Sequence, residues 1–323
     1  MSAYMPLDAL AIFRALADPT RLRIFHLLRA MELSIGELAQ VLGQSQPRVS
    51  RHVKILSDAG LADRRKEGSW VFLGLGHEQA VAPLFAAMDG WNGESEENWV
   101  ATDRARLAAV RADRAAAAAR YFADHAEEWD AIRSLHVPES AVERQILSIL
   151  SDSPVGRLVD IGTGTGRMIE LIGDHADSAL GIDRSPEMLR LARVKLAEAG
   201  LDGAELRQGD MYALPLADGT ADLVLLHQVL HFAQHPSAAI AECARLLSPG
   251  GRLLIVDFAS HDLEELRTRD AHARLGFGDE QIGAWFASVG LGLERVEALV
   301  GDALTVKLWL GVRGQRAQLK VAS

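Results

Sequence analysis

Residues 158–166, Leu-Val-Asp-Ile-Gly-Thr-Gly-Thr-Gly, constrain the fold of this chain more than any other stretch. A short apolar run typical of a buried strand leads into three alternating glycines, Gly162, Gly164 and Gly166, and a helical pattern follows. Glycine has no Cβ and tolerates positive φ, so this turn lets the backbone approach a nucleotide-like ligand closely. The order strand, glycine turn and helix predicts one unit of a parallel α/β sheet.

Other features of the second half extend this pattern. Asp183 ends a second strand-like stretch nineteen residues after Gly164, the spacing of a carboxylate that accepts ribose hydroxyls. Gly209-Asp210-Met211 and Pro249-Gly250-Gly251 stand beside later strands. Strands are expected near 157–162, 179–183, 204–208, 222–228, 252–258, 292–299 and 304–313. Their alternation with helices predicts a mostly parallel seven-stranded sheet, with an antiparallel pair of strands at one edge.

Together these residues resemble the class I S-adenosylmethionine-dependent methyltransferases over about residues 120–314. The resemblance implies a Rossmann-like α/β domain that binds S-adenosylmethionine or S-adenosylhomocysteine. The implied cofactor-binding residues are Asp160, Gly162, Gly164, Gly166, Asp183, Asp210, Met211, His227 and Tyr121. A nicotinamide-binding fold is the main alternative. Its glycines stand at i, i+2 and i+5, whereas the third glycine here comes one residue early, which favours the methyltransferase.

The resemblance also implies roles for these residues. Asp160 would hold water or the amino group of the methionyl moiety, and Asp183 would accept both ribose hydroxyls. Asp210 would accept the adenine amine while Met211 packs on the ring. His227 would line the mouth of the site near the sulfonium. For each acid, capping of the next helix is the structural alternative.

Methyl transfer requires little chemistry from a protein, because the sulfonium is already activated and alignment of the acceptor dominates. A base is needed only for a hydroxyl, thiol or amine acceptor. The candidate catalytic residues are His227 and His231, with His235, His261 and His272 as further possibilities, although a single histidine is more often structural. The segment 121–130 resembles the helix that many small-molecule methyltransferases fold over their cofactor, with Tyr121 and Trp129 near one helical face.

The first ninety residues carry a different pattern, of short helices and one hairpin. Ser34 and Glu37 have the spacing of a capping box, and a helix from about residue 45 precedes a predicted hairpin over 61–75. Outward residues on this helix would suit the major groove, and basic residues in the hairpin would reach the flanking phosphates. The candidate DNA-binding residues are Gln46, Arg48, Ser50, Arg51, Lys54, Arg64, Arg65 and Lys66. A solvated face on an ordinary helical domain is the alternative.

This head resembles the ArsR/SmtB winged-helix repressors in the runs Ala17-Asp18-Pro19-Thr20-Arg21-Leu22-Arg23-Ile24, Glu37-Leu38-Ala39 and Val49-Ser50-Arg51-His52. The resemblance implies a homodimer, formed through the first and last helices of the head, on a palindromic double-stranded operator. Arsenic-sensing members carry Cys-x-Cys on the third helix, where this chain has Ser34 and Gly36. The zinc ligands of the last helix are missing as well, so no metal site is expected.

The composition is consistent with two domains. We expect a winged helix-turn-helix domain (1–92), mainly α with a β-hairpin wing, a helical connector (93–120), the methyltransferase domain (121–314) and a frayed tail (315–323). Residues 1–76 carry ten Lys and Arg against seven Asp and Glu, whereas the rest carries 24 against 37, so only the head is expected to meet nucleic acid.

The single cysteine, Cys243, lies in an apolar helical stripe and excludes an intrachain disulfide framework. No apolar run long enough for a membrane span and no secretion signal are present, so a cytoplasmic protein is expected. Two functions stay open at this point. The methyltransferase domain could be the sensor, with cofactor occupancy changing operator affinity, or a working enzyme on a small-molecule acceptor with an autoregulatory head.

Overall fold

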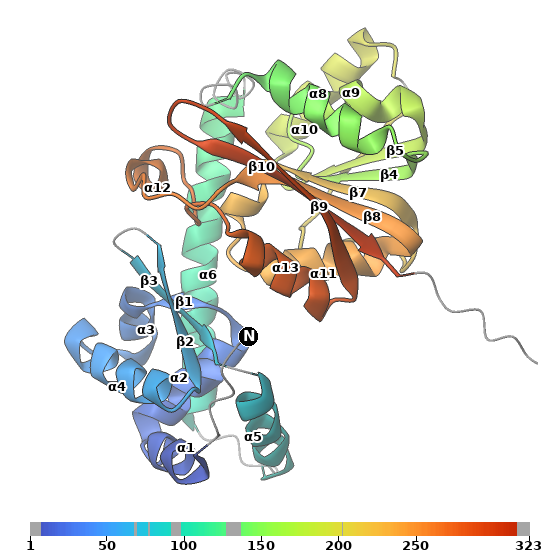
Figure 1. The fold of residues 1–323 in the computed structure, drawn as a ribbon. Coiled ribbons are helices and arrows are strands. Elements are labelled where there is room, and N and C mark those ends of the chain that lie inside the picture. The colour runs from blue at the N-terminus through green and yellow to red at the C-terminus, as the bar shows by residue number, and fades with distance from the viewer. Residues whose placement is uncertain are drawn as a thin grey trace, which may run out of the picture. The chain divides into compact units, whose positions relative to one another are not determined.

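The computed structural model describes residues 8–67, 70–76, 78–91, 98–126, 137–201 and 203–314. The chain divides into two compact units, Met1–Ala117 and Ala118–Ser323 (Figure 1). The division falls inside one helix, α6 (Asn98–His125), so this helix contributes residues to both units. Several predicted features lie outside the described residues: the turn residue Gly68, the aromatic Trp129 and the tail 315–323. The same is true of the expected break at Glu94–Asn98, of which only Asn98 is described.

The first unit is built from short helices around a small sheet. Its elements are α1 (Ala9–Leu16), α2 (Pro19–Ala30), β1 (Leu33–Ser34), α3 (Ile35–Leu42), α4 (Gln46–Asp58), β2 (Ala62–Glu67), β3 (Trp70–Leu75), α5 (Glu78–Trp91) and the first part of α6. The three strands are antiparallel in the order β1-β3-β2. The strands β2 and β3 therefore pair where the sequence predicts a hairpin.

Local sequence signals explain where these helices start and stop. The Asp18 carboxylate accepts the N–H of Arg21 at 3.0 Å and caps α2. Ser34 and Glu37 form the expected capping box at the start of α3, with the Glu37 carboxylate accepting the Ser34 N–H at 2.8 Å. Gly43 ends α3 in a left-handed conformation (φ 65°), which glycine adopts without strain. The helix-turn-helix pair α3–α4 follows from these caps.

The core of the first unit collects apolar residues from every helix, α6 included. Ile24 and Phe25 of α2 are fully buried, and Leu107 and Val110 of α6 belong to the same cluster. The spacing of Leu7, Leu10, Phe13 and Leu16 predicts an apolar stripe on the first helix. In the structure the buried residues of α1 are Ile12 and Ala15, and Leu16 is the member of the stripe that packs against the core. Leu10 and Phe13, two members of the stripe, are 57% and 60% exposed.

The second unit is a seven-stranded sheet. Its strands are β4 (Gly156–Ile161), β5 (Ala176–Asp183), β6 (Glu205–Gln208), β7 (Ala221–His227), β8 (Leu247–Phe258), β9 (Leu291–Val300) and β10 (Thr305–Arg313). They lie in the order β6-β5-β4-β7-β8-β10-β9. The first five are parallel, and β10 is antiparallel to both of its neighbours. The predicted mostly parallel sheet and its antiparallel pair at one edge are confirmed.

Helices cover both faces of this sheet. The helices are α8 (Glu139–Leu150), α9 (Arg167–Ile172), α10 (Pro186–Glu198), α11 (Pro236–Leu246), α12 (Glu265–Arg269) and α13 (Asp279–Ser288). Figure 1 shows α8, α9 and α10 on one face and α11 and α13 on the other. Successive strand residues face opposite sides, so Leu225 packs with the α8 and α9 residues while Val224 and Leu226 pack with those of α11 and α13.

One strand begins earlier than its sequence pattern suggests. The structure starts β8 at Leu247, not near residue 252, and takes Pro249-Gly250-Gly251 into the strand. The register against β7 shifts between Ala221 and Leu223, so the extra residues are absorbed as a bulge. Cys243 is fully buried in α11, as expected for a core residue. Among the described residues, no helix is long and apolar enough to cross a membrane.

Candidate functional site

The polar residues predicted from strand ends lie at one edge of the sheet. Asp160 stands near the end of β4, and Asp183 and His227 are the last residues of β5 and β7. Asp210 follows β6 after a single intervening residue. Because β6, β5, β4 and β7 are neighbouring parallel strands, their carboxyl ends meet at the same edge. Ligands of open α/β sheets bind at this edge.

The glycine turn between β4 and α9 requires glycine at several points. Gly162, Gly164 and Gly166 have φ values of 72°, 55° and 84°, a region that other residues enter only with strain. The N–H groups of Gly162 and Thr163 donate to the Ile182 carbonyl at 2.7 and 3.0 Å. A Cβ at Gly162 would lie 2.3 Å from Cγ2 of Val229. The turn is therefore packed tightly between β5 and the segment after β7.

Asp183 is tied directly to this turn. One carboxylate oxygen accepts the N–H of Gly164 and the other accepts the N–H of Ser185, both at 2.8 Å. Burial raises the pKa of Asp183, and hydrogen bonds from the backbone N–H groups of Ser185, Gly164 and Arg184 oppose that rise. The nineteen-residue spacing in the sequence thus corresponds to a direct hydrogen bond in the structure.

Two further groups at this edge were not predicted from the sequence. The hydroxyl of Thr163 is buried and makes no hydrogen bond within the described part of the chain. Asp160, three residues earlier, is 1% exposed. Tyr212 accepts the N–H groups of Gln234 and His235 through its hydroxyl, at 2.8 and 3.1 Å. The Tyr212 bond ties the segment after β6 to the segment after β7. A buried hydroxyl with no partner suits a site that takes a polar ligand.

The segment after β6 is more open than the two turns beside it. Asp210 is exposed and accepts the Tyr212 N–H at 3.1 Å, and Met211 is half-buried. The backbone of Asp210 forms an isolated antiparallel bridge with Ala213. The structure therefore places Asp210 and Met211 on a short turned segment at the edge.

Tyr121 comes from α6 and belongs to the second unit. It is 9% exposed and packs with Phe122, Met188 of α10 and Phe232. Its hydroxyl donates to Asp270 at 3.4 Å, and burial together with that carboxylate raises the pKa of Tyr121 to about 12. α10 starts at Pro186, three residues after Asp183, so Met188 brings this cluster close to the carboxyl end of β5.

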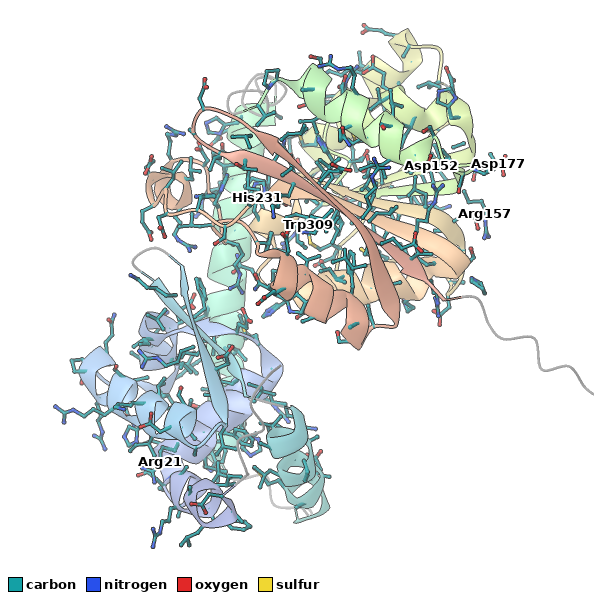
Figure 2. All side chains as sticks on the ribbon, in the orientation of Figure 1. Arg21, Asp152, Arg157, Asp177, His231 and Trp309 are labelled. Atoms are coloured by element: carbon teal, nitrogen blue, oxygen red, sulfur yellow. The ribbon has the colours of Figure 1, made fainter. Side chains whose placement is uncertain are left out.

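The two candidate bases have different surroundings. His227 Nε2 lies 3.7 Å from an oxygen of Glu139 in α8. His231 lies in the short 3-10 helix Leu230–Phe232, where its Nδ1 is 2.8 Å from Oδ1 of Asp257 in β8. Figure 2 labels His231 beside the sheet. The Asp257 partner was missed in the sequence, although an acid at the end of the apolar run Leu253–Val256 is the signal that identified Asp160 and Asp183.

In the first unit, α4 divides into an apolar and a polar face. Val49, Val53 and Leu56 are fully buried, as their spacing predicts. The predicted contact residues Gln46, Arg48, Arg51 and Lys54 are exposed, and Ser50 is half-buried. Lys54 bonds Asp58 at 2.9 Å, whereas Arg48 and Arg51 make no ion pair with a described residue.

The structure describes the side chains of two of the three basic residues predicted to contact DNA from β2. Arg64 and Lys66 are exposed and share one face of the strand, because they are two residues apart. The side chain of Arg65 lies outside the described side chains. The exposed cations of α4 and β2 give the first unit two candidate positions for phosphate contacts.

Comparison with known proteins agrees with this division. Residues 159–255 match the methyltransferase domain family, and residues 16–65 match a helix-turn-helix domain family. A malonyl-[acyl-carrier protein] O-methyltransferase from Methylococcus capsulatus is 39% identical over 116 residues, which cover 35% of this chain and 42% of that protein. A phosphatidylethanolamine N-methyltransferase from Cereibacter sphaeroides is 37% identical over 33% of this chain and 53% of its own. The chain thus spans about half the length of these curated relatives.

Among solved structures, a chain in the complex between the Haloferax volcanii Trm112 methyltransferase activator and a methyltransferase aligns with a TM-score of 0.51. It is 19% identical and covers 62% of this chain and 99% of its own length, which establishes the fold. The protein therefore joins a helix-turn-helix domain to a Rossmann-like methyltransferase domain. The predicted cofactor, S-adenosylmethionine or S-adenosylhomocysteine, is confirmed for this domain.

Proposed function

We propose that this protein is a DNA-binding regulator of the ArsR/SmtB type whose second unit transfers a methyl group from S-adenosylmethionine to a small molecule. The observation that carries the proposal is the sheet edge where β4, β5 and β7 end. Asp160, the glycine turn, Asp183 and His227 come together there, and a hydrogen bond from Gly164 fixes Asp183 against the turn. In the first unit, the exposed cations of α4 and β2 support the DNA-binding role.

The residues of the edge fit the cofactor group by group. Asp183 would accept the ribose hydroxyls through the lone pairs that Gly164 and Ser185 leave open. Asp160 and the Thr163 hydroxyl would hold the amino-acid end, and Gly162, Gly164 and Gly166 let the backbone lie against it. Asp210 and Met211 would contact the adenine. When bound, S-adenosylmethionine supplies a methyl group already activated on sulfur.

What remains for the protein is to hold an acceptor in line and to exclude water. Tyr121 and Phe232 pack together near the start of α10 and would cover the bound ligand. His227, the last residue of β7, and His231, which follows the strand, would face the acceptor. The proposal is tested by binding and turnover. Labelled S-adenosylmethionine should bind the full chain, and Asp183→Ala should abolish binding while the first unit stays folded by circular dichroism.

The regulatory role predicts specific DNA binding by the first unit. Gln46, Arg48 and Arg51 lie at the start of α4, where they would reach base edges and phosphates, while Ser50, Lys54 and the β2 wing would contact the backbone. The resemblance implies a homodimer on a palindromic operator. The exposed apolar side chains of Leu10 and Phe13 support a dimer contact through α1. Selection from a random pool of duplexes should recover a palindrome, and its absence would contradict this part. A cytoplasmic location accompanies this role.

A second candidate function is cofactor sensing, and α6 favours it. The same helix places Leu107 and Val110 in the core of the first unit and Tyr121 in the cluster beside Asp183. Ordering of Tyr121 by a bound ligand would thus act on a helix that the first unit also uses. Affinity for the selected duplex should then differ at least tenfold between free protein and protein with S-adenosylmethionine or S-adenosylhomocysteine, about 1.4 kcal/mol of coupling. Equal duplex affinities with and without cofactor would contradict the sensing role and leave only the enzyme role.

A further inference from the structure

A buried histidine–carboxylate pair lies at the same sheet edge. Beyond the 2.8 Å contact between His231 Nδ1 and Asp257 Oδ1, the backbone N–H of His231 donates to Oδ2 at 3.1 Å. The N–H of Phe258 donates to Oδ1 at 2.7 Å. Asp257 has no exposed surface and His231 has 2%. All the hydrogen bonds that fix this carboxylate are therefore internal to the protein.

This geometry sets the tautomer of the ring. The Asp257 carboxylate already accepts two backbone N–H groups, so it acts as an acceptor and Nδ1 of His231 is the donor of the third bond. In the neutral ring Nε2 is then the nitrogen with the lone pair. The ring is also held from its backbone, because the His231 carbonyl accepts the N–H groups of Ala273 and Arg274 at 3.0 and 2.9 Å. A base held by a second group through its other ring nitrogen is a recurrent arrangement in general-base catalysis.

Aromatic rings surround the imidazole. The ring centroids of Phe232, Phe258 and His272 lie 4.0, 5.0 and 4.2 Å from that of His231. The rings of Phe258 and His272 are nearly parallel, with 17° between their planes. Such surroundings favour a flat aromatic group, because stacked and edge-on ring contacts are attractive. The other candidate base, His227, is 3.7 Å from Glu139, too far for that carboxylate to fix its tautomer by a hydrogen bond.

We infer that His231 is the general base of the methyltransferase, that Asp257 positions it, and that the acceptor is a hydroxyl group on an aromatic ring. This inference rests on the methyltransferase function proposed above. The acceptor oxygen forms a bond to the methyl carbon while the carbon–sulfur bond breaks and sulfur keeps the electron pair. The hydroxyl proton passes to Nε2 of His231. The resulting imidazolium is stabilised by the buried Asp257 carboxylate.

Two probe acceptors test the base. In mildly alkaline buffer phenol stays protonated, like the tyrosine side chain, whereas 4-nitrophenol is ionised and needs no base. His231→Gln should slow methylation of phenol about 100-fold or more, with little effect on 4-nitrophenolate. Asp257→Asn should also slow the phenol reaction, because the Asn amide can donate to Nδ1 and move the ring proton to Nε2. Asp262→Asn, an exposed acid on the same unit, is the matched control. Equal losses with both phenols would overturn the base role.

Nitrogen-15 NMR of the histidines, in the full chain with S-adenosylhomocysteine bound, tests the positioning role directly. Nδ1 of His231 should be the protonated nitrogen, and Asp257→Asn should reverse the tautomer. An unchanged tautomer would overturn the role of Asp257. Retained affinity for S-adenosylhomocysteine shows that each variant is folded. Cofactor binding without transfer to either phenol would overturn the aromatic hydroxyl acceptor, whereas failure to bind the cofactor would overturn the proposed function itself.

Discussion

Replacing Gly162 by alanine should destabilise the methyltransferase unit in two separable ways. Its φ of 72° lies in the left-handed region, which costs alanine about 1–2 kcal/mol. The new Cβ would also lie 2.3 Å from Cγ2 of Val229, far inside the carbon–carbon optimum of about 3.5–4.0 Å. Overpacking of this kind costs about 1–3 kcal/mol. The free energy of unfolding should therefore fall by about 2–5 kcal/mol.

Gly200 provides a matched control for the backbone contribution. It has a φ of 77°, but a Cβ there would meet nothing within 4 Å. Gly200→Ala should therefore cost only about 1–2 kcal/mol. The assay is thermal unfolding followed by circular dichroism, where about 2–4 °C per kcal/mol is expected for a unit of this size. Gly162→Ala should lower the Tm by about 4–20 °C, and S-adenosylhomocysteine affinity should fall with it.

A double-mutant cycle with Val229→Ala identifies the clash. Removing the two methyl groups that face Gly162 should restore part of the lost stability, with a coupling of about 1–3 kcal/mol. Two results would refute the reasoning. One is a Gly162→Ala variant no less stable than Gly200→Ala, and the other is no coupling to Val229. Either would mean that the turn is not packed against the segment after β7.

Three further predictions concern the cofactor, the DNA and the dimer. Burial raises the pKa of Asp183, and ribose hydroxyls need its ionised form. On acidification, the affinity for S-adenosylhomocysteine measured by calorimetry should therefore begin to fall at a higher pH than it would with an ordinary aspartate. An affinity that does not change with pH would contradict this. Arg51→Ala should weaken binding to the selected duplex and lower the slope of log affinity against log salt concentration by about one. Arg193→Ala, at an exposed position of the second unit, is the control. An unchanged slope for Arg51→Ala would contradict a phosphate contact. Phe13→Glu should give monomers in sedimentation, whereas Val300→Glu, at an 83% exposed position, should not; a dimeric Phe13 variant would place the interface elsewhere.

The division of the chain and most of its strands follow from local sequence. Apolar periodicity and the Ser34–Glu37 capping box depend on residues within a turn or two of each other, so they can be recognised before any fold is known. The same holds for Gly162, whose conformation is set by its own backbone, and for Asp183, whose distance along the chain from Gly164 is that of one strand–helix–strand unit.

The tertiary structure decided which distant residues meet. His231 and Asp257 are 26 residues apart, and only the parallel pairing of β7 with β8 brings them within a hydrogen bond. In the sequence Asp257 stands directly before Phe258 in an apolar run and is easily taken for an interruption of the strand, because periodicity gives the face of a residue but not its partner. The same limit explains α1, where spacing predicts an apolar stripe but packing turns Ile12 inward and leaves Phe13 exposed.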